Sequence, residues 1–183
     1  MTLDSAHRDG NISLDTHSLY GIQEIKVTHE WFKQRNQRTF IIERSSFAGM
    51  GKYGSRWLGD NFSEVKFMQL SVSGTMLMNM FGIPLVGADI CGFLDNTNQT
   101  LCVKWHFVGA FYPFSRNHNG GSVAQEPYVW DNTAQGHMRD AIKLKYSLVR
   151  YFYTSLVDQS LKGTGTFYKP MFFEFPDDMN TYD

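Results

Sequence analysis

The sequence of 183 residues has no sustained basic run, few cysteines and no long apolar segment. Its 17 basic and 18 acidic residues leave a net charge of −1, which argues against a partner with a phosphate backbone. No run approaches the roughly 18 apolar residues that cross a bilayer. The opening MTLDSAHRDGNIS lacks the basic flank and apolar centre of a signal peptide. We therefore expect no nucleic acid as partner, no membrane span and no signal peptide in this chain.

Cysteine is scarce, because only Cys91 and Cys102 occur. Two cysteines are too few ligands for a structural zinc site unless histidines join them. The residues alone leave two options open, a disulfide or two buried thiols. Three Asn-x-Ser/Thr sequons, at Asn11, Asn61 and Asn98, are compatible with a secretory route, but such triplets arise easily by chance.

What the chain does contain is an alternation of short apolar runs and helical patterns. Helices are predicted over residues 15–35, 64–80, 99–111 and 133–162, the last as two helices. Strands are predicted over 39–43, 83–89 and 168–176, with a further strand end in FSRNHNGG. Ser63 is the predicted N-cap of the second helix, which its apolar residues predict to be buried. Such alternation predicts an α/β fold with a parallel sheet.

The chemically distinctive residues follow the carboxyl ends of the predicted strands, where parallel sheets and barrels gather their sites. We therefore expect six residues to converge: Arg44, Trp57, Asp60, Asp89, Phe93 and His118. Aromatic rings stack on the apolar faces of sugars, while charged groups form strong hydrogen bonds to hydroxyls. Cleavage of a glycosidic bond would need a protonated carboxylic acid opposite a second carboxylate.

Each of these residues also has a purely structural interpretation. Asp60, in Gly-Asp-Asn, suits a turn that starts the next helix, and Asp89 could cap a strand. His118 between two asparagines could be an ordinary loop histidine, and Arg44 could form a structural ion pair. The aromatic residues could belong to the core. Composition and spacing alone therefore leave a hydrolase, a binding module and a scaffold as open alternatives.

Six longer motifs help to distinguish between these alternatives. They are HSLYG (17–21), RSSFAGMGKYGSRWLGDN (44–61), GIPLVGADICGF (82–93), GAFYPFSRNHN (109–119), QEPY (125–128) and KPMFFEFP (169–176). In order and spacing they resemble the catalytic domain of glycoside hydrolase family 31, most closely its acid α-glucosidase and maltase-glucoamylase branch. The resemblance implies that residues 1–183 form one incomplete (β/α)8 TIM barrel, roughly its C-terminal half.

The resemblance also implies roles for the loop residues. Asp60 falls on the general acid/base, Arg44 on a residue that binds a sugar hydroxyl, and Trp57 on a wall of the glucose pocket. Three further positions would line the same pocket: Asp89, Phe93 and His118. The resemblance favours a disulfide between Cys91 and Cys102 and a lysosomal or secreted protein. It implies no cofactor and no metal.

The chain departs from the family at four places. Ser55 and Arg56 replace a usual Gly-His, Lys52 replaces an arginine, and Arg150 stands where relatives often have a proline between two helices. The fourth departure is the nucleophile, which belongs to a W-x-D-M-N-E motif upstream of the HSLYG segment. The only aspartates before that segment lack the motif: Asp4, Asp9 and Asp15.

The expected function is therefore that of a retaining α-glucosidase that releases terminal glucose from α-1,4-glucans or maltooligosaccharides. This chain would carry the acid/base side of the site without the nucleophile. Its expected partners are the α-glucan substrate and either the missing N-terminal half of the barrel or a protein that covers the same surface. The alternative is a noncatalytic sugar-binding remnant or a structural subunit derived from the hydrolase fold.

Overall fold

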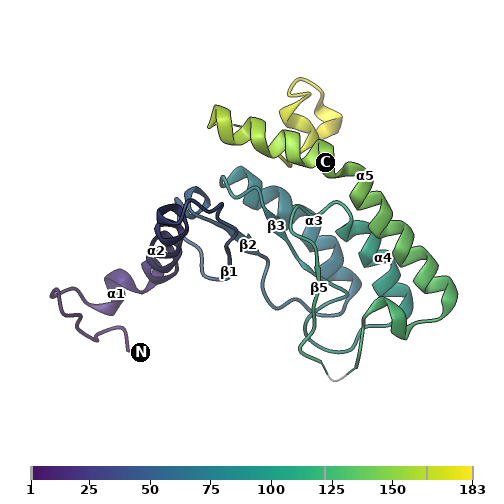
Figure 1. Cartoon of the computed structure of the whole chain (residues 1–183), viewed down its shortest axis with the longest axis horizontal. Helices are drawn as coiled ribbons and strands as arrows, with labels where there is room; N and C mark the ends of the chain where they lie inside the picture. The colour runs from purple at the N-terminus through teal and green to yellow at the C-terminus, as the bar shows by residue number, and fades with distance from the viewer. Residues whose placement is uncertain (1, 122, 164, 183) are drawn as a thin grey trace. The chain divides into compact units, whose positions relative to one another are not determined.

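The computed structural model describes residues 2–121, 123–163 and 165–182, and the chain divides into two compact units, Met1–Arg56 and Trp57–Asp183 (Figure 1). Within the described residues, parallel strand pairs alternate with helices, which confirms the predicted α/β fold. These residues do not by themselves form a closed barrel.

The first unit begins with three helical segments, α1 (Ser13–Thr16), the 3₁₀ turn η1 (His17–Leu19) and α2 (Tyr20–Gln34). They occupy the region predicted as one helix. β1 (Ile42–Glu43), the turn η2 (Met50–Lys52) and β2 (Ser55–Trp57) follow, and β1 pairs with β2 in parallel. Of the strand predicted over 39–43, the last two residues form β1. Sequence reasoning misses the strand β2, because Ser-Arg-Trp carries no apolar alternation.

Gly21 of the HSLYG motif explains how α2 packs in the first unit. A Cβ atom at Gly21 would collide with the backbone carbonyl oxygen of Ser45, in the loop that follows β1. Glycine therefore lets the helix approach the backbone of this loop directly. On the same helix, the Ile25 side chain is 2% exposed and forms part of the core.

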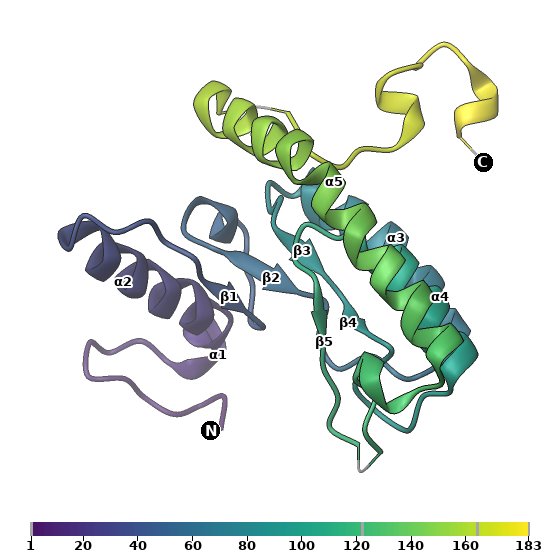
Figure 2. The same ribbon diagram turned by 45° about the vertical axis from the view of Figure 1, so that its right-hand side comes forward.

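The second unit carries most of the regular structure. Its elements in chain order are α3 (Val65–Met80), β3 (Val86–Gly87), β4 (Asp89–Ile90), α4 (Gln99–Gly109), β5 (Arg116–Asn117), η3 (Pro127–Val129), α5 (Asn132–Lys162), η4 (Met171–Phe173) and η5 (Met179–Thr181). β4 and β5 are parallel, with Asp89 opposite Arg116 and Ile90 opposite Asn117. α4 and α5 lie side by side (Figure 2). Among the described helices, none is both long and apolar enough to cross a membrane.

Helix α3 begins one residue later than predicted and ends at the predicted residue, but it does not have the predicted orientation. Its fully buried residues are Ser71, Thr75 and Asn79, spaced four apart on one face, whereas apolar residues such as Leu70 and Leu77 are exposed. The polar face can be buried because its groups are paired: the Thr75 hydroxyl donates to a backbone carbonyl of its own helix, and Asn79 accepts from the backbone N–H of Tyr168. The prediction of a helix buried through its apolar residues is wrong.

Three local predictions in this unit are also corrected. The N-cap of α3 is Glu64 rather than Ser63, whose hydroxyl donates to the Asp95 carbonyl instead. Residues 132–162 form one helix of 31 residues, capped by Asp131 and ended by Gly163 at a φ of 65°, rather than two.

The third correction concerns the last predicted strand, over 168–176, where the structure has the 3₁₀ turn η4. Proline at 170 and 176 removes two backbone donors from this segment. Met171, Phe173 and Phe175 are exposed, so this apolar run does not form a buried strand. Apolar character alone does not distinguish a strand from a proline-bounded turn.

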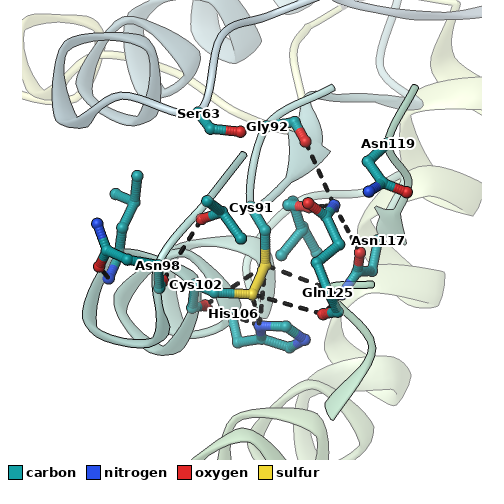
Figure 3. The surroundings of a disulfide bond; sticks show 12 residues. Ser63, Cys91, Gly92, Asn98, Cys102, His106, Asn117, Asn119 and Gln125 are labelled. Atoms are coloured by element: carbon teal, nitrogen blue, oxygen red, sulfur yellow. Dashed lines mark hydrogen bonds between the residues drawn. A yellow bond between two sulfur atoms is a disulfide. The ribbon is translucent and has the colours of Figure 1, made fainter. Parts of the chain in front are cut away.

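The core of the second unit surrounds a disulfide between Cys91 and Cys102 (Figure 3). Cys91 follows β4 and Cys102 lies in the first turn of α4, so the bond fixes the start of the helix to the end of the strand. The structure thus contains the pairing that the family resemblance implies. Trp105 and Met138, both fully buried, pack in the same cluster.

Replacing both cysteines with serine should lower the free energy of unfolding by about 3 kcal/mol, because the disulfide closes a short loop in the unfolded chain. The two cysteines are 11 residues apart in sequence. Urea unfolding of the oxidised wild type and the double variant measures the difference. Wild-type protein treated with a dithiol should match the variant, and identical stability of all three forms would contradict the prediction.

His106 lies against the disulfide and is itself buried. Its Nδ1–H donates to the Cys102 carbonyl at 2.8 Å. Burial lowers the pKa of His106 below its ordinary value, and this hydrogen bond opposes the shift only in part. The imidazole is therefore kept neutral in the folded protein at a pH where the unfolded chain already binds a proton.

This lowered pKa predicts an acid-sensitive contribution to stability. The contribution is fully present above the ordinary histidine value of about 6.5 and is lost as pH falls toward the folded pKa, because the unfolded state then binds more protons. His106→Gln should flatten the fall in unfolding free energy over this window. The matched variant His137→Gln, at an exposed position of α5, should keep the wild-type slope. If the unfolding free energy falls equally steeply with pH in all three proteins, His106 is not the source of the acid sensitivity.

Candidate active site

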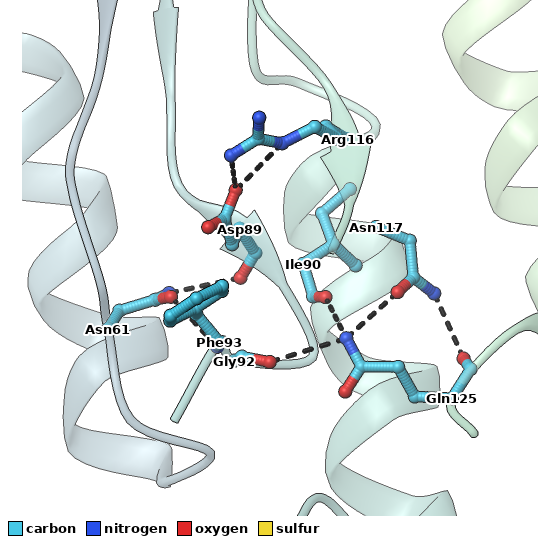
Figure 4. A network of polar contacts seen from close by, with 8 residues as sticks. All are labelled: Asn61, Asp89, Ile90, Gly92, Phe93, Arg116, Asn117 and Gln125. Carbon is cyan, nitrogen blue, oxygen red and sulfur yellow. Dashed lines mark hydrogen bonds and ion pairs between the residues drawn. The ribbon is translucent and has the colours of Figure 1, made fainter. Parts of the chain in front are cut away.

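The site begins with an ion pair between neighbouring strands. Asp89 opens β4 and Arg116 opens β5, and the parallel register places the two residues opposite each other. Arg116 donates to Asp89 Oδ1 through Nε at 3.0 Å and through Nη2 at 2.5 Å (Figure 4). The Asp89 carboxylate is completely buried, while the Arg116 side chain is 35% exposed. The arginine therefore neutralises a charge that the strand holds inside the protein.

The second carboxylate oxygen of Asp89 has a different environment. Oδ2 is buried, and no described residue donates a hydrogen bond to it. Burial raises the pKa of Asp89, the hydrogen bonds and charge of Arg116 lower it, and the nearby charges of His118 and Asp60 act in opposite directions. The net shift is upward. Both His118 and Asp60 thus lie within electrostatic range of this carboxyl group.

Asn61 connects the loop that carries Asp60 to the end of β4. Its side chain donates to the Asp89 carbonyl at 3.0 Å and accepts from the Phe93 backbone N–H at 3.2 Å. The Asn61 carbonyl also accepts from the backbone N–H of Phe93 at 2.8 Å. These bonds hold the residue after Asp60 against the strand end that carries Asp89.

Gly92 allows this close contact. It has a φ of 94°, and a Cβ atom at this position would overlap the backbone of Ser63. Glycine adopts this conformation without strain, so the Cys-Gly-Phe sequence turns sharply beside the loop that follows β2.

Aromatic rings flank the ion pair. The Phe93 and His118 rings lie 5.1 Å apart at a tilt of 34°. The Arg116 guanidinium lies 5.5 Å from the Trp57 ring and 5.4 Å from the Phe114 ring. The arrangement places cationic, anionic and aromatic groups around one strand edge, the combination that binds polar ligands with apolar faces.

The structure therefore brings together five of the six predicted residues, all in the second unit: Trp57, Asp60, Asp89, Phe93 and His118. The sixth, Arg44, follows β1 and belongs to the first unit. Its predicted contact with a sugar stays a prediction, as do the roles assigned to the other five.

Sequence reasoning misses the polar residues that support this edge. Gln125 is 2% exposed, and its side-chain amide donates to the carbonyls of Ile90 and Gly92 and to the side chain of Asn117 (Figure 4). Asn117 in turn donates to the Gln125 carbonyl at 3.0 Å. These bonds fix the backbone on either side of Cys91. The only signal in the sequence is the Gln-Glu-Pro-Tyr motif, which predicts no role by itself.

A carboxylate and an arginine on neighbouring parallel strands, with aromatic rings beside them, define the class of this protein, an α/β domain with a polar site on its parallel strands. Residues 1–155 match the family model for the glycosyl hydrolases family 31 TIM-barrel domain. The chain belongs to glycoside hydrolase family 31.

Individual relatives agree with this assignment. The chain is 46% identical over 180 residues to lysosomal alpha-glucosidase of Bos taurus, covering 97% of this chain and 19% of that relative. It is 41% identical to an uncharacterised family 31 glucosidase of Schizosaccharomyces pombe, again over 97% of this chain and 18% of the relative. The solved glucosidase II alpha subunit in its alpha3-Glc2-bound form superposes with a TM-score of 0.92 at 30% identity, over 99% of this chain and 20% of that one. The chain thus spans about a fifth of the length of these relatives.

Proposed function

We propose that this chain forms the acid/base side of a retaining α-glucosidase site that releases terminal glucose from α-1,4-linked glucans. Asp60 protonates the leaving oxygen and then activates water, while Trp57, Asp89, Phe93 and His118 hold the terminal glucose. Arg44 binds one of its hydroxyls. The family membership, the glucosidase relatives and the clustering of five of these residues support this proposal.

The observation that best supports this proposal is the buried Oδ2 atom of Asp89, which has no hydrogen-bond donor among the described residues. A buried carboxylate oxygen without a donor is costly, so native proteins leave few of them. Arg116 binds only Oδ1, which leaves Oδ2 as an acceptor without a donor among the described residues. Because Oδ2 is buried in this chain, a sugar hydroxyl reaches it only when neighbouring side chains move aside; it then supplies the missing donor through a charge-assisted hydrogen bond, while the pyranose face packs on a ring.

Retaining hydrolysis also needs a nucleophile about 5 to 5.5 Å from the acid/base. The early aspartates Asp4, Asp9 and Asp15 lie outside any W-x-D-M-N-E motif. The proposed nucleophile therefore comes from polypeptide bearing that motif, and residues 1–183 together with it complete the barrel. This half-barrel arrangement makes the rest of the barrel, or a protein that covers the same surface, the required partner.

The proposed compartment is the secretory or lysosomal route. The Cys91–Cys102 disulfide suits an oxidising environment, and the mammalian relatives are named as lysosomal enzymes.

The activity can be tested by joining residues 1–183 to an upstream half that carries the nucleophile motif. The joined protein should hydrolyse a fluorogenic α-glucoside but not the matching β-glucoside, and NMR should detect the α-anomer of glucose first because the reaction retains configuration. A noncatalytic sugar-binding protein would instead show a rise in melting temperature with glucose and no turnover. Release of the β-anomer first would contradict the retaining mechanism.

A further inference from the structure

The three Asn-x-Ser/Thr sequons occupy different structural environments, and these decide which can carry a glycan in the folded protein. Attached sugar chains are bulky and hydrophilic and must extend into solvent. The linkage uses the side-chain nitrogen of asparagine, so this atom must be accessible. The accessibility and hydrogen bonds of Nδ2 therefore separate usable sequons from blocked ones.

Asn61 is blocked. The residue is 7% exposed, and its Nδ2 donates to the Asp89 carbonyl. Its Oδ1 accepts from the backbone N–H of Phe93, so both ends of the amide bind the strand end (Figure 4). A sugar on Nδ2 would displace the bond to Asp89 and enter the packed site. The folded protein therefore has no room for a glycan here.

Asn11 is only partly suitable. The asparagine is exposed, but its Nδ2 donates to the Asp9 carboxylate at 3.0 Å. The hydroxyl residue of the sequon, Ser13, is 1% exposed. The motif is therefore embedded in the packed start of α1 rather than presented as a surface loop.

The sequon at Asn98, in contrast, is exposed to solvent. Both Asn98 and Thr100, the hydroxyl residue of its sequon, are exposed. The backbone at Asn98 is extended, with φ −121° and ψ 162°, immediately before α4 begins. Its Oδ1 caps the helix by accepting from the Leu101 N–H at 3.0 Å. A glycan on Nδ2 leaves this oxygen in place, so modification and capping are compatible.

The disulfide gives independent support, because Asn98 lies inside the loop that Cys91 and Cys102 close (Figure 3). Disulfides persist in the oxidising secretory compartments, and sequons mark surface loops of proteins that pass through them. The loop between Cys91 and Cys102 thus contains both a disulfide and an exposed sequon, two features of proteins that pass through the secretory compartments.

We propose that Asn98 is an N-glycosylation site and that Asn61 is not modified in the folded protein. The donor is an oligosaccharide joined to a lipid through a diphosphate. A bond forms between Asn98 Nδ2 and the anomeric carbon of the first sugar, the bond from that carbon to the diphosphate breaks, and the lipid diphosphate leaves while the amide loses one proton. The proposal rests on the secretory route proposed above and is independent of hydrolase activity.

The test is translation of the full chain, preceded by a cleavable signal peptide, into endoplasmic-reticulum microsomes. Electrophoresis of the protease-resistant, disulfide-bonded fraction should show one mobility shift that peptide-N-glycosidase removes, and peptide mapping should then find aspartate at position 98. The shift should be lost in Asn98→Gln and in Thr100→Ala. The second variant matters because it removes the sequon and keeps the capping oxygen.

Two matched variants in the same region provide controls. Thr97→Ala leaves the Asn98 sequon intact, and Ser63→Ala removes only the sequon of Asn61, so both should keep the full shift. A folded, oxidised wild type without a shift would overturn the proposal. So would a Thr100→Ala protein with the same mobility as the glycosylated wild type, or a shift that disappears in Ser63→Ala. Each of these results can be read whether or not the completed barrel hydrolyses a glucoside.

Discussion

Asp60→Asn in the completed barrel should lower kcat/KM for maltose by at least about a hundredfold, the usual contribution of a general acid/base. Asparagine has nearly the shape of aspartate but can neither donate a proton to the leaving oxygen nor take one from water. Asp60 lies one residue before Asn61, whose hydrogen bonds hold the loop against β4, so the exchange leaves those anchors untouched. Initial rates of glucose release measure the effect.

Comparing substrates with different leaving groups shows whether Asp60 acts by proton transfer. A substrate whose leaving group departs without protonation, such as glucosyl fluoride, bypasses the acid in the first step, so the loss should be much smaller for it than for maltose. Asp140→Asn, at an exposed position of α5, is the matched control and should retain wild-type rates. If Asp60→Asn slows both substrates equally, the residue acts in binding or folding, and the acid/base role is excluded.

The sequence predicts positions along the chain better than orientations in space. Strand–loop–helix alternation correctly predicts parallel strand pairing and places Phe93 after a strand, because the pattern of apolar runs is local, but the strand predicted over 83–89 is divided between β3 and β4. The predicted orientation of α3 is wrong because it depends on which face meets the neighbouring elements, and the face with Ser71 and Thr75 can satisfy its own hydrogen bonds.

Residues that support the site are harder to predict than residues that form it. The Arg116–Asp89 pair requires the strand register, which no single segment encodes. Gln125 contributes through four hydrogen bonds to and from residues far apart in sequence, so a polar residue in a loop gives no sign of its burial. The disulfide is left open by the residues and is implied only by family resemblance.

Arg116→Ala should destabilise the folded protein by about 3 to 5 kcal/mol, because it removes the cation that pairs with the buried Asp89 carboxylate. Burial already raises the pKa of Asp89, and Arg116 is the main group that lowers it. Urea unfolding near neutral pH measures the loss. Arg139→Ala, at an exposed position of α5, removes an equal charge and should change stability by less than about 0.5 kcal/mol.

The pH dependence separates an unpaired charge from a simple loss of packing. An acid whose folded pKa is raised binds its proton more tightly when folded, so its charged form costs stability as pH rises from the ordinary aspartate value of about 3.9 through the folded pKa. Without Arg116 this window extends further upward, so the destabilisation should be greatest near neutral pH and should shrink as the solution is acidified. The double variant Asp89→Asn with Arg116→Ala removes the charge itself and should recover much of the stability at neutral pH. A loss that is equally large at every pH, and that the double variant does not relieve, would mean that Arg116 stabilises the strand pair through packing on Trp57 and Phe114 rather than through its charge.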